Sequence, residues 1–129
     1  MQRALFTIGN VKVWVYNVHL NASRKGESER LKEIKYLLRW IKSINAVNCI
    51  EIVVGDFNME PKERGYSLMH RAGFRSAMKT LRGREELTYP SGLKSMFVAQ
   101  VGPYTLDYIW YRGVKGGKIE CISAELVGN

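Results

Sequence analysis

The sequence predicts an α/β (α+β) domain with a mostly antiparallel β-sheet and two helices on one face of the sheet. Runs rich in β-branched and aromatic residues are separated by glycine-marked turns, a long amphipathic helical pattern lies between two of them, and no internal repeat is present. With 129 residues, 46% of them hydrophobic and 25% charged, we expect one domain over residues 1–129 that needs no disulfide framework.

A β-hairpin is expected at the start of the chain. Residues 4–8 and 11–20 have strand composition, and Gly9-Asn10 between them suits a tight turn. In the second strand Val11, Val13 and Val15 alternate with Trp14, Tyr16 and Val18, so both faces are apolar. We therefore expect both faces of this strand to be covered.

The next elements are a helix, a strand and a second helix. Apolar residues recur every three or four positions from 27 to 44, which indicates an amphipathic helix. Residues 50–55 form a short apolar strand. A second helix is expected to begin near Pro61, a favoured first-turn residue, and to end before Gly73.

The last third of the chain has a long connection and two more strands. Residues 79–100 are polar and turn-rich without sustained periodicity, and long connections are often functional. Strand composition returns at 104–111 and at 118–126, with the glycine-rich turn 113–117 between them.

Charge and cysteine content narrow the class of protein. The chain carries 20 Lys and Arg against 12 Asp and Glu, a formal net charge of +8, which suggests an anionic partner. No apolar stretch is long enough to span a bilayer, and the first residues do not resemble a signal peptide. Cys49 and Cys121 lie far apart in apolar runs, so we expect both to be reduced thiols buried in the fold. Reduced cysteines indicate an intracellular, reducing compartment, either the cytoplasm or the nucleus.

Three polar clusters lie at strands, where α/β proteins collect functional groups. They are Asn17-Val18-His19, Gly55-Asp56-Phe57-Asn58 and Leu106-Asp107-Tyr108. On an extended backbone Asp56 and Asn58 would point to the same side, with Gly55 allowing a sharp turn. The alternative is that Asp56 and Asn58 form an Asx turn that caps the next helix.

The histidines and Asp107 allow a structural and a functional interpretation. His19 near a strand end is either a packed residue or a catalyst, and His70 is expected on a solvated helix face with no function. Asp107 is an ionisable group in an apolar strand, which predicts a cation or a hydrogen-bonding partner for it.

The order and spacing of Asn-Val-His-Leu, an amphipathic helix, Val-Gly-Asp-Phe-Asn, a long loop and Leu-Asp-Tyr-Ile-Trp resemble the C-terminal half of the endonuclease/exonuclease/phosphatase superfamily. The resemblance covers residues 3–126 and extends to exonuclease III-like and deoxyribonuclease-like members. Residues 88–92, Thr-Tyr-Pro-Ser-Gly, resemble a loop of the deadenylase-like branch. The resemblance to the superfamily implies a single partial domain, which is half of a four-layer fold in which two sheets pack face to face.

The resemblance also implies roles for four residues. His19 would contact the scissile phosphate, Asp56 and Asn58 would orient the attacking water and hold the transition-state oxygens, and Asp107 would orient a catalytic histidine. Arg30 matches a position with structural support as its role. The implied reaction is Mg²⁺-assisted hydrolysis of a phosphoric ester, with Asp56 and Asn58 as the candidate metal ligands.

Two parts of the family pattern are not found in these 129 residues. They are the Glu that ligates Mg²⁺ in the N-terminal half and the Ser-Asp-His motif. We therefore expect a truncated Mg²⁺-dependent phosphodiesterase or nuclease domain, with Mg²⁺ weakly bound or absent, that is inactive as an isolated chain.

A half-domain would leave one face of its sheet bare, which predicts association through that face, as a homodimer or with the missing half-domain. The competing hypotheses are a non-catalytic module that binds nucleic acid or protein, and a structural domain whose charge only keeps it soluble. The +8 charge favours nucleic acid over sphingolipid or inositol phosphate, and we expect that charge near the rim formed by His19, Asp56, Asn58 and Asp107. Tyr89 and Trp110 are either core residues or base-stacking platforms.

Overall fold

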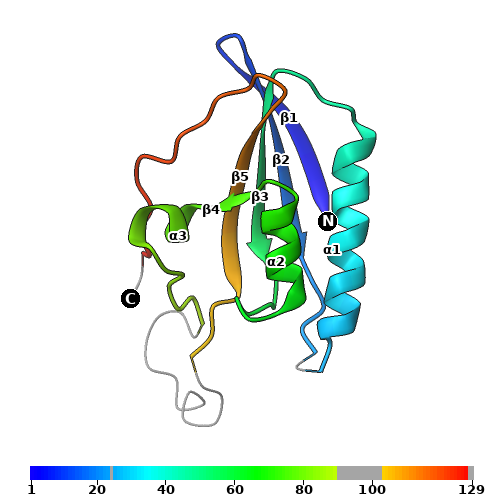
Figure 1. Ribbon diagram of the computed structural model, residues 1–129, viewed down its shortest axis with the longest axis vertical. Helices are drawn as coiled ribbons and strands as arrows, with labels where there is room; N and C mark the ends of the chain where they lie inside the picture. The colour runs from blue at the N-terminus through cyan, green and yellow to red at the C-terminus, as the bar shows by residue number, and fades with distance from the viewer. Residues whose placement is uncertain (24, 90–102, 128–129) are drawn as a thin grey trace.

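The computed structural model describes residues 1–23, 25–89 and 103–127. Five strands form one sheet in the order β1-β2-β3-β5-β4. The strands are β1 (Gln2–Ile8), β2 (Val11–His19), β3 (Cys49–Asp56), β4 (Arg75–Ser76) and β5 (Asp107–Val114), and the helices are α1 (Glu27–Ser43), α2 (Arg64–Arg71) and α3 (Ala77–Arg82). All neighbouring strands are antiparallel except the parallel pair β2 and β3. The predicted fold class is thereby confirmed, with one parallel pair in the sheet (Figure 1).

The predicted hairpin, first helix and central strand form at the expected places. Gly9 adopts φ +59°, as the tight turn between β1 and β2 requires. The helix α1 connects the parallel strands β2 and β3, which need a crossover of this kind. Helix α2 is shorter than predicted, because residues 61–63 form the turn before it.

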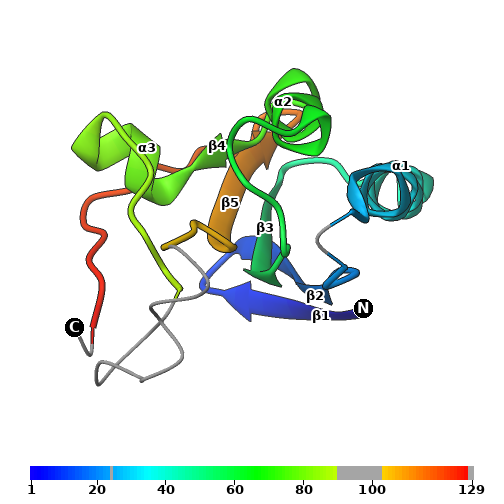
Figure 2. The ribbon, with the colours of Figure 1, turned by 90° about the horizontal axis from the view of Figure 1, so that it is seen from below.

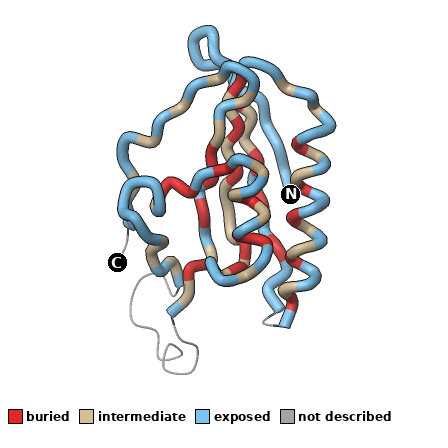
Figure 3. The backbone as a smooth tube through the Cα atoms, viewed as in Figure 1, coloured by how far each residue is buried: buried red, intermediate tan, exposed pale blue. Residues whose placement is uncertain are grey.

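Helices α1 and α2 lie side by side on one face of the sheet, as predicted (Figure 2). The core between them and the sheet is largely aromatic and aliphatic, and its largest members include Tyr16, Ile34, Leu37, Phe57, Phe74 and Trp110. Buried residues follow the inner side of α1 and the central strands (Figure 3). No helix in the described ranges is long and apolar enough to cross a membrane.

The opposite face of the sheet carries no helix over β1, β2 and β3 (Figure 2), whereas at β5 the side chain of Tyr111 on this face is buried and its hydroxyl donates to Oγ1 of Thr80 in α3. This face presents the alternate residues of each strand, among them Phe6, Ile8, Val11 and Ile109, which are exposed. The expectation that both faces of β2 are covered is therefore wrong for the described chain: only the helix side is. The bare face predicted for a half-domain is present.

The strand predicted at 118–126 does not form, and those residues have no regular secondary structure. In the sheet, β5 pairs with β3 on one edge and with β4 at Tyr111 and Trp110 on the other. The segment instead runs outside β4 and α3 (Figure 1), where Arg75 donates to the Ile119 carbonyl and Arg82 to the Ala124 carbonyl.

The long connection predicted at 79–100 begins later than expected, because α3 extends to Arg82. Ser76 caps this helix by accepting from the Lys79 N–H, and Gly83 ends it in the left-handed conformation. Residues 90–102 of the connection lie outside the described residues. The strand predicted at 104–111 begins only at Asp107.

Both cysteines are free thiols. Cys49 is buried as predicted, whereas Cys121 is only half-buried, because the segment that carries it is not a strand of the sheet.

Candidate active site

Three of the predicted site residues lie at the same edge of the sheet. His19 ends β2 and is the register partner of Asp56, which ends β3, and Asp56 is in turn the partner of Asp107, the first residue of β5. Register partners on neighbouring strands point to the same face, with Cβ atoms roughly 5 Å apart in antiparallel pairs. The three side chains therefore form a row at the end of the bare face, which we call the rim.

His19 and Asp56 are close without forming a hydrogen bond. Nε2 of His19 lies 3.9 Å from Oδ2 of Asp56, and the two side chains are 74% and 37% exposed. His19 is therefore not a packed core residue, and both the imidazole and the carboxylate are accessible to a ligand.

Asp56 and Asn58 form an Asx turn. The Asn58 N–H donates to Oδ1 of Asp56 at 2.7 Å, and Asn58 has φ +46°. The expectation that both side chains share a side through an extended backbone is wrong, because the chain turns at Asn58 into the left-handed region. The turn does not cap α2, whose first residue is Arg64. It holds Asn58 beside Asp56 through the backbone.

The side chain of Asn58 also bridges two strand ends. Its amide group donates to the Leu20 carbonyl at 3.0 Å, and the Leu20 N–H donates to the Asp56 carbonyl at 2.9 Å. Gly55 has φ +131° and lies against the Val18 carbonyl, so no Cβ fits there. This close approach of β2 and β3 explains the glycine in Gly-Asp-Phe-Asn.

Asp107 is exposed, so solvent reaches its carboxylate, and the cation or hydrogen-bonding partner expected for it stays a prediction. Asp107 occupies the first position of β5 on the bare face, where it lines a second hollow together with residues of α3 and of the segment 121–126. Its position is fixed through the backbone: Oγ1 of Thr88 accepts from the N–H groups of Leu106 and Asp107 at 2.9 and 3.0 Å.

Thr88 and Tyr108 therefore position the rim, although the sequence singled out neither for that role. The Tyr108 hydroxyl is buried and donates to the Met59 carbonyl at 2.8 Å, which ties β5 to the loop after Asn58. Burial raises the pKa of Tyr108, which keeps the hydroxyl protonated as the donor. No local pattern could reveal these contacts, because the partners are 18 to 49 residues apart.

Arg30 has the structural role expected for it. Its side chain is 4% exposed, and its guanidinium donates to both carboxylate oxygens of Glu63 at 2.9 and 3.0 Å. It also donates to the carbonyls of Asn21 and Ser23. The pair ties the loop after β2 to the turn before α2 and so fixes the helix side of the rim.

A hollow of about 400 Å³ adjoins Asn58 on this side. It is lined by Ala22, Ser23, Arg30, Asn58, Glu60, Glu63, Tyr89, Tyr104 and Leu106. Tyr89 is exposed and pairs with Tyr104 through two backbone hydrogen bonds of 2.9 Å. Trp110, by contrast, is fully buried and belongs to the core. The rest of the predicted loop, residues 90–92, lies outside the described residues.

The rim is not the basic surface that the net charge led us to expect. The only base among the described residues that line the hollow is Arg30, which is already paired with Glu63. Asp56 and Asp107 make the edge of the bare face acidic. The surplus positive charge of the described residues lies elsewhere.

The donor set of the rim suits Mg²⁺ in part. Oδ2 of Asp56 and the carboxylate of Asp107 are hard oxygen donors on one face, and Mg²⁺ is typically held by one or two carboxylates with water and substrate phosphate completing the shell. The Asn58 amide nitrogen is engaged with Leu20, which leaves its oxygen as a possible donor. The described residues gather no group of three His, Cys, Asp or Glu side chains.

Solved structures with this fold provide the comparison. The catalytic domain of human Nocturnin with bound sulfate anion is 30% identical over 80% of this chain and 36% of its own, with a TM-score of 0.63. D. rerio TDP2 complexed with single strand DNA product is 21% identical over 91% of this chain and 48% of its own, with a TM-score of 0.68. Sphingomyelinase C from Streptomyces griseocarneus is 14% identical over 91% of this chain and 42% of its own, with a TM-score of 0.67.

No family model and no curated protein matches the sequence. The chain spans less than half the length of each of these three solved structures. Nocturnin, TDP2 and sphingomyelinase C are all members of one superfamily, and this chain has the fold of the part that it matches in each. The chain is therefore similar in fold to part of the domain that members of the endonuclease/exonuclease/phosphatase superfamily share.

Proposed function

We propose that the chain is the half of a Mg²⁺-dependent phosphoric ester hydrolase domain that carries the substrate-facing rim, and that its substrate is nucleic acid. The register of His19, Asp56 and Asp107 across three adjacent strands carries the proposal. An imidazole donor beside two open carboxylates is the combination that hydrolysis of an anionic ester needs.

The proposed roles follow from the donors and acceptors at the rim. His19 donates to a non-bridging phosphate oxygen, since its imidazole is open to solvent. Asp56 orients the attacking water through Oδ2, because Oδ1 is occupied by the Asn58 N–H. Asn58 helps to hold the water and the phosphate oxygens, and Asp107 orients a further group brought by the missing part of the domain. Mg²⁺, held by Asp56 with the Asn58 oxygen or Asp107, would neutralise charge on the phosphoryl oxygens.

We propose that these 129 residues alone do not hydrolyse the substrate. The chain covers less than half of each matched structure, and the bare face carries no helix over β1, β2 and β3. A second sheet packed there would enclose the rim and supply further ligands. The proposed occupant is a complementary half-domain or, for the isolated chain, a second copy.

Nucleic acid is the proposed substrate class for two reasons. The TDP2 structure was solved with a single strand DNA product. The hollow beside Asn58 has the exposed ring of Tyr89 in its wall, and unpaired bases stack on such rings. The free thiols of Cys49 and Cys121 support a reducing intracellular compartment.

A chimera tests the proposal. The part of the Nocturnin catalytic domain that this chain matches is replaced by this chain, and Mg²⁺-dependent hydrolysis of bis(p-nitrophenyl) phosphate and of end-labelled single-stranded RNA is measured. We expect activity in the chimera and none in the 129-residue chain. Asp56→Ala should lower the rate at least roughly 100-fold, by loss of the group that orients the attacking water.

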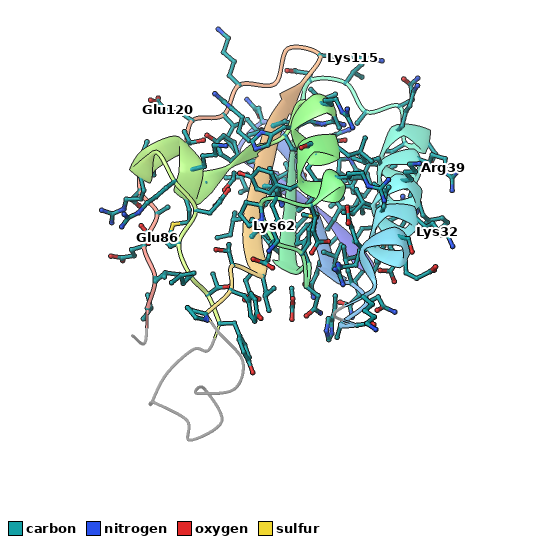
Figure 4. The ribbon with its side chains drawn as sticks, turned by 60° about the horizontal axis from the view of Figure 1, so that its bottom comes forward. Lys32, Arg39, Lys62, Glu86, Lys115 and Glu120 are labelled. Carbon is teal, nitrogen blue, oxygen red and sulfur yellow. The ribbon has the colours of Figure 1, made fainter. Side chains whose placement is uncertain are left out.

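Glu120→Ala is the matched control, because Glu120 is an exposed carboxylate far from the rim (Figure 4). It should leave the rate within about twofold. A folded chimera without activity, or equal losses in the two variants, would contradict the proposed roles.

The second candidate function is a binding module without catalysis. The basic surface of α1, described in the next subsection, favours it. Inactivity of the chimera together with salt-sensitive RNA binding would support this second function.

A further inference from the structure

Helix α1 presents a row of basic side chains on its outer face. Lys32, Lys35, Arg39 and Lys42 follow one another at spacings of three and four, so they lie along one side of the helix. All four are exposed, and Lys32 and Arg39 point away from the body of the molecule (Figure 4). This surface faces away from the sheet and is separate from the rim.

The acidic residues of α1 are concentrated at its beginning. Glu27 pairs with Arg64, Glu29 pairs with Lys32, and Glu33 accepts from the Asn21 N–H. Within the described ranges Lys35, Arg39 and Lys42 have no carboxylate partner. We call these three residues the basic stripe.

Helix stability does not explain the basic stripe. Lys42 in the last turn is favourable for the helix dipole, but Lys35 and Arg39 lie in the interior of a 17-residue helix, beyond the reach of that effect. As like charges four residues apart, Lys35 and Arg39 repel each other and cost the helix about 0.2–0.5 kcal/mol. The arrangement therefore favours an external anion.

An exposed aromatic ring adjoins the basic charges. Tyr36 is 57% exposed, and on the helix surface it is the neighbour of Lys32 and Arg39 at spacings of four and three. Amphipathic helices normally turn their aromatic residues toward the core, as α1 does with the half-buried Trp40, whose ring lies against Tyr16. An unpaired nucleobase can stack on a ring flanked by cations, while the neighbouring phosphates of the strand contact the basic side chains.

We propose that the basic stripe, together with Tyr36, is a binding surface for single-stranded nucleic acid. Lys35 to Lys42 spans about 10 Å along the helix axis, which matches a few nucleotides of an extended strand. The exposed tyrosine favours a strand with unpaired bases over a duplex, whose bases are stacked inside. The contact is to the backbone and to one base, so it carries little sequence preference.

This proposal extends the proposed function, and it rests on that function for the path of the nucleic-acid strand, which runs from the rim to the basic stripe. The helix α1 begins at the end of the sheet where the rim lies, and the basic stripe occupies its second half (Figure 1). A strand held at the rim would therefore reach the stripe only if it is several nucleotides longer than the scissile unit. This identifies the substrate as a polymer rather than a mononucleotide.

The test measures binding of the 129-residue chain to fluorescein-labelled oligouridylates of 4, 12 and 24 nucleotides by anisotropy, with EDTA present. The variant Lys35→Glu/Arg39→Glu/Lys42→Glu is compared with Lys12→Glu/Arg84→Glu/Lys118→Glu, which changes the net charge equally at exposed positions outside α1. Circular dichroism establishes that both variants are folded. Tyr36→Ala is compared with Tyr36→Phe.

We expect the stripe variant to bind the 24-mer at least tenfold more weakly. Its log K against log salt should be flatter by about 2, since each phosphate contact on a single strand contributes roughly 0.7 to the slope. The control triple variant should lose less than about threefold. Tyr36→Ala should weaken binding to the 24-mer but not to inorganic polyphosphate, and Tyr36→Phe should bind as the parent does.

Equal losses in the two triple variants would overturn the proposal, because net charge and not the location of the charges would then decide binding. It would also be overturned by stripe-dependent binding to phosphatidylserine vesicles without binding to the oligonucleotides. Failure of the proposed hydrolysis is distinguishable from both, since the binding assay contains no Mg²⁺ and measures no cleavage.

Discussion

The two faces of the sheet are built from alternate residues of the same strands and differ in what covers them. In β5, Trp110 is fully buried beneath α2, whereas its neighbour Ile109 points to the bare face and is 55% exposed. In the hairpin Tyr16 is buried and Phe6 is 51% exposed. One face therefore stabilises the chain by itself, and the other has apolar surface available for association.

The largest effect should come from the helix side. Trp110→Ala removes a ring that contacts Phe57, Tyr66, His70 and Tyr108, and should lower the free energy of unfolding by about 3–5 kcal/mol. Ile109→Ala, one residue away, should cost less than about 1 kcal/mol, because little of its surface is buried. Urea denaturation monitored by circular dichroism measures both. Similar losses would mean that the bare face is covered in solution.

The bare face should control association. We expect the 129-residue chain to sediment as a homodimer at micromolar concentration, and Phe6→Lys/Ile109→Lys to raise the dissociation constant about a hundredfold, since two unpaired charges enter the interface. Analytical ultracentrifugation gives both values. Lys32→Ala/Lys42→Ala on the opposite side is the control. A clean monomer of the unmodified chain would contradict the expectation.

The sequence could predict the elements that local patterns determine. The hairpin follows from strand composition around Gly9-Asn10, and α1 follows from its apolar period. The strand at 118–126 was predicted from composition alone, but a strand also needs backbone partners, whereas this segment accepts from the side chains of Arg75 and Arg82. The six-residue α3 is too short to show a period. Which apolar face of β2 is covered depends on the position of the helices, which alternation cannot reveal.

The candidate site was predictable to the same extent. Strand-end clusters identified His19, Asp56 and Asp107, because adjacent strands bring their ends together. The left-handed backbone at Asn58 and the hydroxyl of Thr88 beneath Asp107 depend on contacts between distant segments, so the sequence could not reveal them. The placement of charge was mispredicted for a related reason: a total of +8 does not say which face carries it.

The smallest expected effect concerns His70, which lies on the helix-covered side of the sheet. It was expected on a solvated helix face, but its ring packs between Tyr66 and Trp110, with centroids 4.8 and 5.1 Å away, and its Nε2 is buried without a hydrogen-bond partner among the described residues. Burial lowers the pKa of His70 below its ordinary value of 6.5, Lys79 lowers it further, and Glu85 opposes the shift.

Because the folded state disfavours the protonated ring, the contribution of His70 to stability is fully present above about pH 6.5, the unfolded-state value, and is lost as the pH falls through the lower folded-state pKa. His70→Phe should keep the packing and remove this loss, so its free energy of unfolding should fall less between pH 7.5 and pH 5 than that of the parent. His19→Gln, at the bare face, is the matched control, since its exposed ring has little packing to lose. Parallel pH profiles for His70→Phe and the parent would mean that the helix-covered face admits a proton without losing its packing.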